Sequence, residues 1–216
     1  MNIILFGAPG SGKGTQAKKI SKEFNLLKVS SGELLRNEIA KNTSLGKKIK
    51  KIVNNGSLVS DDIINNLIEN ILSQKQYFNR LIFDGYPRTL NQVKNLELLI
   101  KKFNQKILCI LSLNVNKEKI IKRVMGRRIC SKCGLAFNEF FNPPDKFNYE
   151  CGLKFLEKRS DDQEKIIKIR YETYLKQTVP IINFYKDKKL VHEINGEGEI
   201  SSIYEEIRTI ITSVKT

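Results

Sequence analysis

Residues Gly7-Ala8-Pro9-Gly10-Ser11-Gly12-Lys13-Gly14-Thr15 decide how the sequence folds, because they join an apolar run to a helical pattern. The run from Asn2 to Phe6 is typical of a buried strand, and residues 15–24 repeat apolar side chains at helical spacing. Glycines allow the loop to turn its backbone N–H groups inward around an anion, and the next helix adds the positive end of its dipole. Lys13 adds a point charge, so the G-x-x-x-x-G-K spacing predicts a binding site for a polyphosphate.

The rest of the chain alternates between strand and helix patterns. Further strands are expected from Leu81 to Phe83, Ile107 to Leu113 and Leu190 to Ile194. Amphipathic spacing predicts helices over residues 32–41, 45–54, 60–73, 89–103, 117–126, 161–185 and 201–213. This alternation predicts an α/β fold of three layers, in which helices cover both faces of a parallel sheet.

Residues 126–159 interrupt the alternation. The helical period disappears there, and glycines, Pro143-Pro144, aromatic residues and a pair of cysteines appear instead. We expect a small inserted module with short strands of its own.

Composition sets the class of protein. The chain has 216 residues, of which 40% are hydrophobic and 28% charged, which is typical of a folded globular protein with one large domain or a core with inserted pieces. Its longest apolar runs are much shorter than the ~20 residues of a membrane span. Met1 leads directly into the first strand pattern, so no signal or transit peptide is expected, and we predict a cytoplasmic protein without membrane association.

The net charge of +15 raises the alternative of a basic zinc-ribbon protein that binds nucleic acid. The cations are 29 lysines and nine arginines, and the lysines are scattered along the whole chain. Scattered lysines favour a solvated surface over a nucleic-acid interface, so no specific nucleic-acid partner is expected.

Five motifs in order resemble those of adenylate kinases, within the nucleoside monophosphate kinases. The segment from Gly7 to Gln16 resembles the opening motif, with Gly14 where Ser or Thr is usual in P-loops. The other four are S-S-G-E-L-L-R at 30–36, G-S-L-V at 56–59, D-G-Y-P-R at 84–88 with Gln92, and R-S-D-D at 159–162 with Arg170. The resemblance covers nearly the whole chain and implies a P-loop core of residues 1–29, 60–125 and 160–216. It also implies a helical domain for the nucleoside monophosphate at 30–59 and a lid at 126–159.

The resemblance also implies two nucleotide sites. For ATP, it implies Gly10, Ser11, Gly12, Lys13, Gly14, Thr15, Arg123, Arg127 and Gly198. For AMP, it implies Ser31, Arg36, Ser57, Leu58, Val59, Gly85, Tyr86, Pro87, Arg88, Gln92, Arg159 and Arg170.

Phosphoryl transfer between two nucleotides requires alignment and charge neutralisation rather than acid or base chemistry. Arginine forks bind phosphate in two places at once, which lysine does not do. The resemblance implies that the catalytic groups are Lys13, Arg88, Arg123, Arg127, Arg159, Arg170 and Asp84. Asp84 would orient water on the Mg²⁺ that accompanies ATP. Asp161 and Asp162 are expected to cap the helix that follows them and to help hold the closed lid.

The acceptor base is expected to be read by Gln92, because its amide both donates and accepts hydrogen bonds. Two features favour AMP over UMP or CMP as the acceptor. In the similar uridylate and cytidylate kinases, alanine commonly stands at the position that Ser31 holds in this sequence. Those kinases also lack the long insert. UMP or CMP as the acceptor, or GTP as the donor, remain the alternatives. The lone His192 lies beside an apolar strand and is expected to be structural.

Three cysteines of the insert predict a structural zinc site. Cys130 and Cys133 form a C-x-x-C pair, Cys151 follows, and Cys109 belongs to a predicted strand. Zinc-type lids of the family imply a fourth ligand at Asn148, which is a poor one, so Asp145, Glu150 or a water remain alternatives. The other alternative is a decayed site, held by packing of Phe137, Phe140, Phe141 and Phe147 alone. Taken over the whole chain, the resemblance implies a monomeric enzyme of the adenylate kinase family, which would interconvert ATP and AMP with two ADP.

Overall fold

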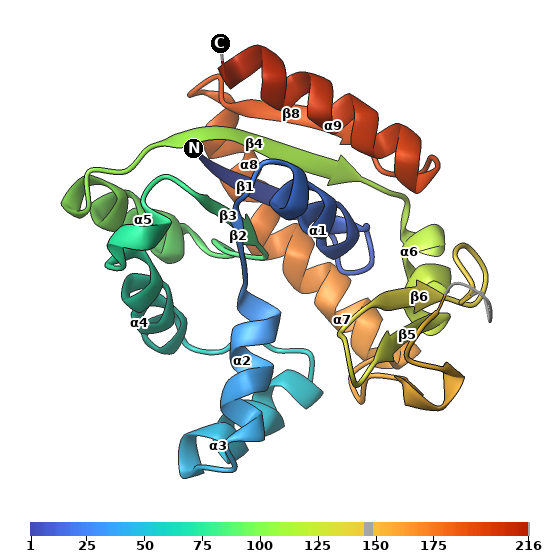
Figure 1. Ribbon diagram of the computed structural model, residues 1–216. Helices are drawn as coiled ribbons and strands as arrows, with labels where there is room; N and C mark the ends of the chain where they lie inside the picture. Colours follow the sequence, from blue (N-terminus) through green and yellow to red (C-terminus); the bar gives the residue numbers. More distant parts are fainter. Residues whose placement is uncertain (145–148, 216) are drawn as a thin grey trace.

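A five-stranded parallel sheet forms the centre of the molecule, in the strand order β2-β3-β1-β4-β8 (Figure 1). The computed structural model describes residues 1–144 and 149–215. The strands of this sheet are β1 (Asn2–Gly7), β2 (Leu27–Ser30), β3 (Leu81–Asp84), β4 (Ile107–Asn114) and β8 (Val191–Asn195). The α/β fold with a parallel sheet is therefore confirmed, and β2 is an additional strand.

Helices cover both faces of this sheet. The α-helices of the described residues are α1 (Lys13–Glu23), α2 (Ser31–Ala40), α3 (Ser44–Asn54), α4 (Asp61–Leu72), α5 (Leu90–Lys102), α6 (Lys117–Met125), α7 (Glu164–Thr173), α8 (Val179–Lys186) and α9 (Ile200–Lys215), of which α4, α5 and α8 pack on one face of the sheet and α1 and α9 on the other. The other helical elements of the described residues are two short 3₁₀ turns, Lys75–Tyr77 and Leu153–Phe155, and a π-helical segment, Tyr174–Thr178.

Alternating side chains of β1 divide the core between two layers. Ile4 and Phe6 are buried on the face that packs against α4, α5 and α8. Ile3 and Leu5 are buried on the opposite face, against α1 and α9. Each strand residue thus faces the layer opposite to that of its neighbour, which explains why this central strand is apolar at every position from Ile3 to Phe6. Cys109 lies on the second of these faces and is completely buried, as expected of a strand residue.

The insert forms a second, three-stranded antiparallel sheet in the order β6-β5-β7. Its strands are β5 (Arg127–Cys130), β6 (Ala136–Asn138) and β7 (Leu156–Glu157). In Figure 1 this sheet lies beside α6 and α7 and opposite the helical pair α2 and α3. The expected strands of the insert are confirmed, whereas the residue bounds of the three domains remain a prediction.

The predicted helix at 161–185 is the part of the fold that differs most from expectation. Its first turn begins at Glu164, and the five residues Tyr174–Thr178 form a π-helical segment between α7 and α8. Pro180 follows that segment in the first turn of α8. A proline has no N–H to donate and its ring clashes with the carbonyl one turn earlier, so the wider π turn accommodates it within a continuous helix.

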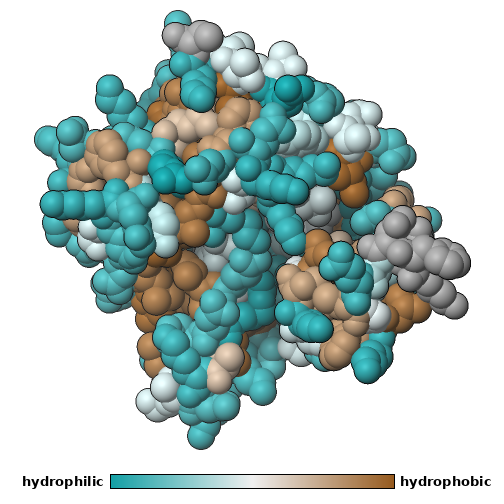
Figure 2. All heavy atoms as spheres, in the orientation of Figure 1, coloured by the Kyte–Doolittle hydropathy of each residue, from teal (hydrophilic) through white to brown (hydrophobic). Residues whose placement is uncertain are grey.

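Hydrophilic side chains cover most of the face in Figure 2, as scattered lysines predict. Within the described ranges, 1–144 and 149–215, no helix combines the length and the apolar character that a membrane crossing requires.

Candidate active site

A cavity of about 1080 Å³ opens at the carboxyl ends of β1 and β3. Its walls come from the β1–α1 loop, α2, the segment between α3 and α4, the small sheet and α7. Figure 2 shows the surface hollowed between the α2–α3 pair and the small sheet. The carboxyl ends of parallel strands are where open α/β sheets place their ligands.

The glycine-rich loop forms one wall as a backbone cradle. Gly12 has a φ of +98°, and α1 begins at the next residue, so the N–H groups of the first helical turn are directed towards the cavity. A Cβ atom at Gly7 would approach Leu113 O to 2.8 Å, so only glycine fits there. The ammonium of Lys13 donates to the carbonyls of Gly7 and Ala8 at 2.6 and 2.8 Å.

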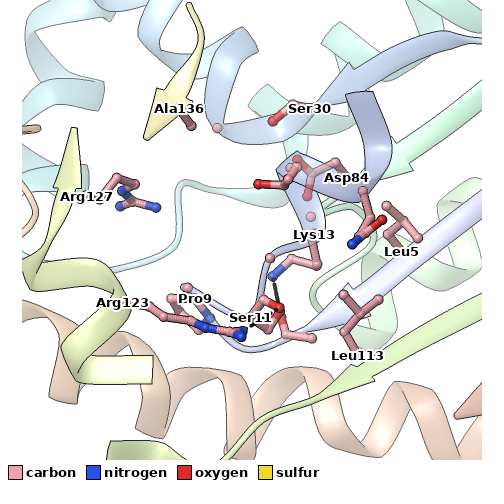
Figure 3. Close-up of a pocket in the computed structure, with 18 of the residues that line it drawn as sticks. Leu5, Pro9, Ser11, Lys13, Ser30, Asp84, Leu113, Arg123, Arg127 and Ala136 are labelled. Atoms are coloured by element: carbon pink, nitrogen blue, oxygen red, sulfur yellow. Dashed lines mark hydrogen bonds between the residues drawn. The ribbon is translucent and has the colours of Figure 1, made fainter. Parts of the chain in front are cut away.

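Six arginines line this cavity together, although they are spread over 135 residues of sequence. They are Arg36, Arg88, Arg123, Arg127, Arg159 and Arg170. In Figure 3, Arg127 extends into the open space of the cavity, whereas Arg123 lies alongside Ser11 of the loop. Such a concentration of guanidinium groups is suited to a ligand with several negative charges.

The family is decided by comparison with known proteins. The family model for adenylate kinase matches residues 5–190. An adenylate kinase of Pelagibacter ubique is 46% identical over 211 residues, which cover 98% of this chain and 99% of that protein. An adenylate kinase of Methanothrix thermoacetophila is 41% identical, over 98% of this chain and 99% of that protein. An adenylate kinase of Archaeoglobus fulgidus is 36% identical, over 100% of both chains.

The chain belongs to the adenylate kinase family. It is therefore a nucleoside monophosphate kinase, and Mg²⁺ with ATP is implied by the family.

Two of the kinase's arginines are paired with buried aspartates. Arg127 forms an ion pair with Asp162, to which its Nε donates at 2.8 Å, and the Asp162 side chain is completely inaccessible to solvent. Arg170 donates to Asp161 Oδ2 at 2.5 Å. The expectation that these aspartates cap the next helix is wrong, because α7 begins only at Glu164 with Gln163 as its N-cap. The two carboxylates form ion pairs with arginines of the cavity instead of accepting hydrogen bonds from the N–H groups at the start of the helix.

Two other arginines have no such partner. Among the described residues, the guanidinium groups of Arg36 and Arg159 make no hydrogen bond and no ion pair. Burial and the neighbouring cations Arg127 and Arg36 lower the pKa of Arg159 to about 10. These two groups face the cavity with free donors, so they are available to an anionic ligand.

Arg88 and Arg123 are held by uncharged groups. Arg88 Nε donates to the carbonyl of Gly85 at 2.7 Å, and its Nη2 donates to Ser31 Oγ at 3.0 Å. Arg123 Nη1 donates to the carbonyl of Gly196 at 2.8 Å. Neutral acceptors orient these guanidinium groups without cancelling their charge.

Asp84 lies at the end of β3, at the floor of the cavity (Figure 3). Its carboxylate has no hydrogen-bond or ion-pair partner among the described residues. A free carboxylate beside the loop is a suitable oxygen donor for a hydrated Mg²⁺, so this donor fits the metal that the family implies.

The cavity also contains the other residues that the sequence predicts to bind nucleotides, with one exception. On the loop side they are Gly10, Ser11, Gly12, Gly14, Thr15 and Gly198, and on the opposite side Ser31, Ser57, Leu58, Val59, Gly85, Pro87 and Gln92. The exception is Tyr86, whose side chain is completely buried and donates to Asn65 Oδ1 at 2.9 Å. Tyr86 therefore belongs to the core and does not line the cavity.

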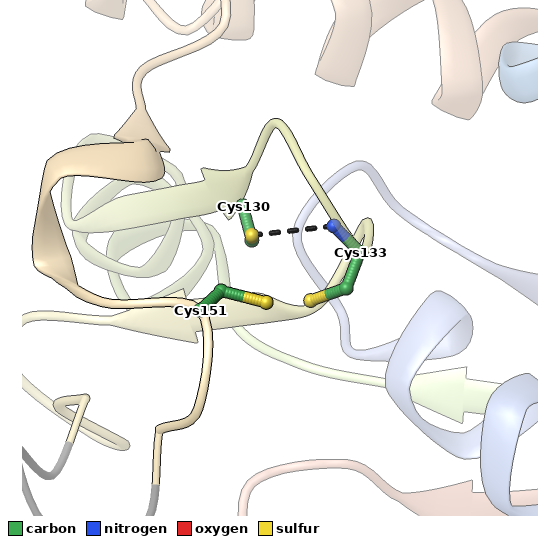
Figure 4. Close-up of side chains that lie close together, drawn as sticks. All are labelled: Cys130, Cys133 and Cys151. Carbon is green, nitrogen blue, oxygen red and sulfur yellow. Dashed lines mark hydrogen bonds between the residues drawn. The ribbon is translucent and has the colours of Figure 1, made fainter.

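The three cysteines of the insert lie together in a separate place. The Sγ atoms of Cys130, Cys133 and Cys151 are all within 4.8 Å of one another, and Figure 4 shows that they point towards a common centre. Glu150 is exposed and does not belong to the cluster, which argues against it as the fourth ligand. Asn148, Asp145 and Phe147 lie outside the described residues.

The described phenylalanines of the insert differ in their contacts. Phe137 packs edge-on against Tyr149 at 4.7 Å between ring centroids, whereas Phe140 and Phe141 are exposed and the Lys122 ammonium lies over their rings at 5.6 and 5.7 Å.

Sequence reasoning missed two residues that position the site. Thr178 Oγ1 donates to the carbonyl of Arg88 at 3.2 Å. Asp61 accepts a hydrogen bond from Gln92 at 2.7 Å. Each acts on a residue distant in sequence, and no local pattern marks such a contact.

Lys13 generates a prediction for the pH dependence of binding. Burial lowers the pKa of Lys13 to about 8, an effect that the nearby Asp84 opposes. A bound polyphosphate favours the charged amine. The affinity for ATP should therefore be highest below pH 8, where Lys13 is protonated before binding, and should fall by up to about tenfold for each pH unit above that. Calorimetric titration with ATP from pH 7 to 9.5 measures this, and Lys13→Arg should remove the dependence. A wild-type Kd that is constant over that range contradicts the prediction.

Proposed function

We propose that this kinase catalyses the reversible reaction ATP + AMP = 2 ADP with Mg²⁺, and that it serves adenine nucleotide balance. The observation that carries the proposal is the shared cavity, in which six arginines lie between a phosphate-binding loop and a buried glutamine amide. A single bound polyphosphate does not need this many cations. Two nucleotides whose phosphates meet in one cavity need them, because their negative charges repel each other.

At the donor end, the loop from Gly10 to Thr15 would hold the ATP phosphates through backbone N–H groups. Lys13 would move from its carbonyl acceptors to the terminal phosphates. Arg127 uses Nε and Nη2 on Asp162, which leaves Nη1 for a phosphate oxygen. Arg123 and Gly198 line the same cavity and would contact the donor base and ribose.

At the acceptor end, Arg36 and Arg88 would bind the phosphate of AMP. The segment Ser57–Leu58–Val59 and Gln92 would enclose the base. Arg88 is already oriented by Ser31 and Gly85, so it loses little side-chain freedom when the phosphate binds.

Transfer would require the two phosphates to approach while their charge is neutralised. Arg159 and Arg170 line the cavity with Lys13 and Arg88 and would bind the group in transit together with them. Mg²⁺, when bound, would supply positive charge that neutralises the phosphates. Asp84 would orient its water ligands. The small sheet lines the same cavity, and its closure would exclude water from the reactive phosphate.

We further propose that Cys130, Cys133 and Cys151 hold a structural zinc ion. Three thiols with converging Sγ atoms provide most of a tetrahedral site. The cluster does not line the nucleotide cavity, which supports a structural role.

We also propose that the enzyme acts as a monomer in the cytoplasm. None of the four cysteines forms a disulfide, which suits a reducing compartment. A single chain supplies the groups of both nucleotide sites, so a second copy is not required.

A panel of ATP and GTP against AMP, UMP and CMP tests the proposed reaction. ATP with AMP should give a kcat/KM at least about 100-fold above that of the pyrimidine acceptors, because a built polar site rejects a mismatched base. Arg88→Lys should lower kcat by at least about 100-fold, and the control Arg80→Lys, on an exposed residue outside the cavity, should not. A preference for UMP or CMP, or Arg88→Lys activity within fivefold of wild type, contradicts the proposal.

Replacing Cys130 and Cys133 together by serine tests the zinc proposal. The double variant should lose bound zinc and melt at a lower temperature, while kcat at low temperature stays within a few-fold of wild type. Metal analysis and thermal unfolding measure these effects, with Lys132→Ser between the two cysteines as the control. Absence of zinc from gently purified wild type would mean a decayed site, and loss of turnover in a folded double variant would exclude a purely structural role.

A further inference from the structure

Gln92 is fixed by two hydrogen bonds that use opposite ends of its amide. Its Oε1 accepts from the backbone N–H of Arg88 at 2.7 Å, and its Nε2 donates to Asp61 Oδ1 at 2.7 Å. The side chain is only 3% exposed. Rotating the amide by 180° would place an NH₂ group against the Arg88 N–H and an oxygen against the carboxylate, so only one orientation is compatible with both partners.

Asp61 is itself held in place. It is the first residue of α4, where the helix dipole stabilises a negative charge. Its second oxygen accepts from Thr89 Oγ1 at 3.0 Å, and Thr89 caps α5 by accepting from the backbone N–H of Gln92 at 3.1 Å. The carboxylate therefore links the first turns of two helices and has a fixed position relative to the amide.

A fixed amide presents one pattern to the cavity. One lone pair of Oε1 and one N–H of Nε2 remain after the two internal bonds, and Gln92 lines the cavity. The pair of an acceptor and a donor matches adenine, in which an exocyclic amine donates and N1 accepts. Hypoxanthine has the reverse pattern, since its O6 accepts and its N1–H donates, and it would require the rotated amide.

We propose that Asp61 is a specificity-determining positioning residue, which locks the Gln92 amide in the orientation that selects a 6-amino purine over a 6-oxo purine. The inference rests on the proposed role of Gln92 as the reader of the acceptor base. Asp61 does not line the cavity, so it acts through Gln92 and not by touching the nucleotide.

The test compares AMP with IMP as the acceptor, with ATP as the donor. Asp61→Asn keeps the size of the side chain but lets its amide turn to face either end of Gln92, so the ratio of kcat/KM for AMP to that for IMP should fall at least tenfold. Asp62→Asn is the matched control, because it removes the same charge from the next, exposed residue of the same helical turn. The control should keep the wild-type ratio within twofold.

A third variant separates this inference from the role of Gln92. Gln92→Leu should bring the ratio close to one if Gln92 reads the base, and an unchanged ratio in that variant would reject the reading role itself. A collapsed ratio in Gln92→Leu with a wild-type ratio in Asp61→Asn would overturn the inference about Asp61. Should Asp61→Asn not fold, Asp61→Ser serves the same purpose, because its hydroxyl is too short to reach the amide and it should lower the ratio likewise.

Discussion

Repulsion among guanidinium groups in one cavity is the constraint on which the rest of the structure depends. Six arginines and Lys13 face a common space, and burial together with neighbouring cations lowers the pKa of Arg88 and Arg159 to about 10. Such a cluster disfavours the empty folded state and favours a bound polyanion. The protein meets the constraint by pairing some of these charges and leaving others without partners.

The fold separates the two kinds of arginine. Asp161 and Asp162 precede α7 and neutralise Arg170 and Arg127, which ties the small sheet to the helix behind the cavity. Arg36 and Arg159 have no partner among the described residues and approach from opposite walls. The paired arginines therefore contribute to the structure of the site, whereas the free ones contribute mainly to binding.

The sequence predicts the layers and, with the exception of Tyr86, the residues that line the cavity, but not the contacts that these residues make with one another. The glycine-rich loop and the alternating apolar patterns have local signatures, so the sheet and the helices are predictable. The strand β2 is not predictable in this way, because its four residues include Lys28 and are too few to show a clear alternation of apolar and polar side chains. Asp161 and Asp162 resemble helix caps locally, and only the tertiary approach of Arg127 and Arg170 shows their different role. Asp61 and Thr178 act across 31 and 90 residues, which no local pattern encodes.

The free energy of unfolding without nucleotide tests the division into paired and free arginines most directly. Arg127→Gln leaves the buried Asp162 carboxylate without its partner and should cost about 3 kcal/mol or more. Arg159→Gln removes a cation that has no partner, so the empty variant should be at least as stable as wild type and should gain less stability from saturating ATP and AMP. Denaturant unfolding of both variants at low salt measures this difference. An empty Arg159→Gln protein that loses as much stability as Arg127→Gln would contradict the account.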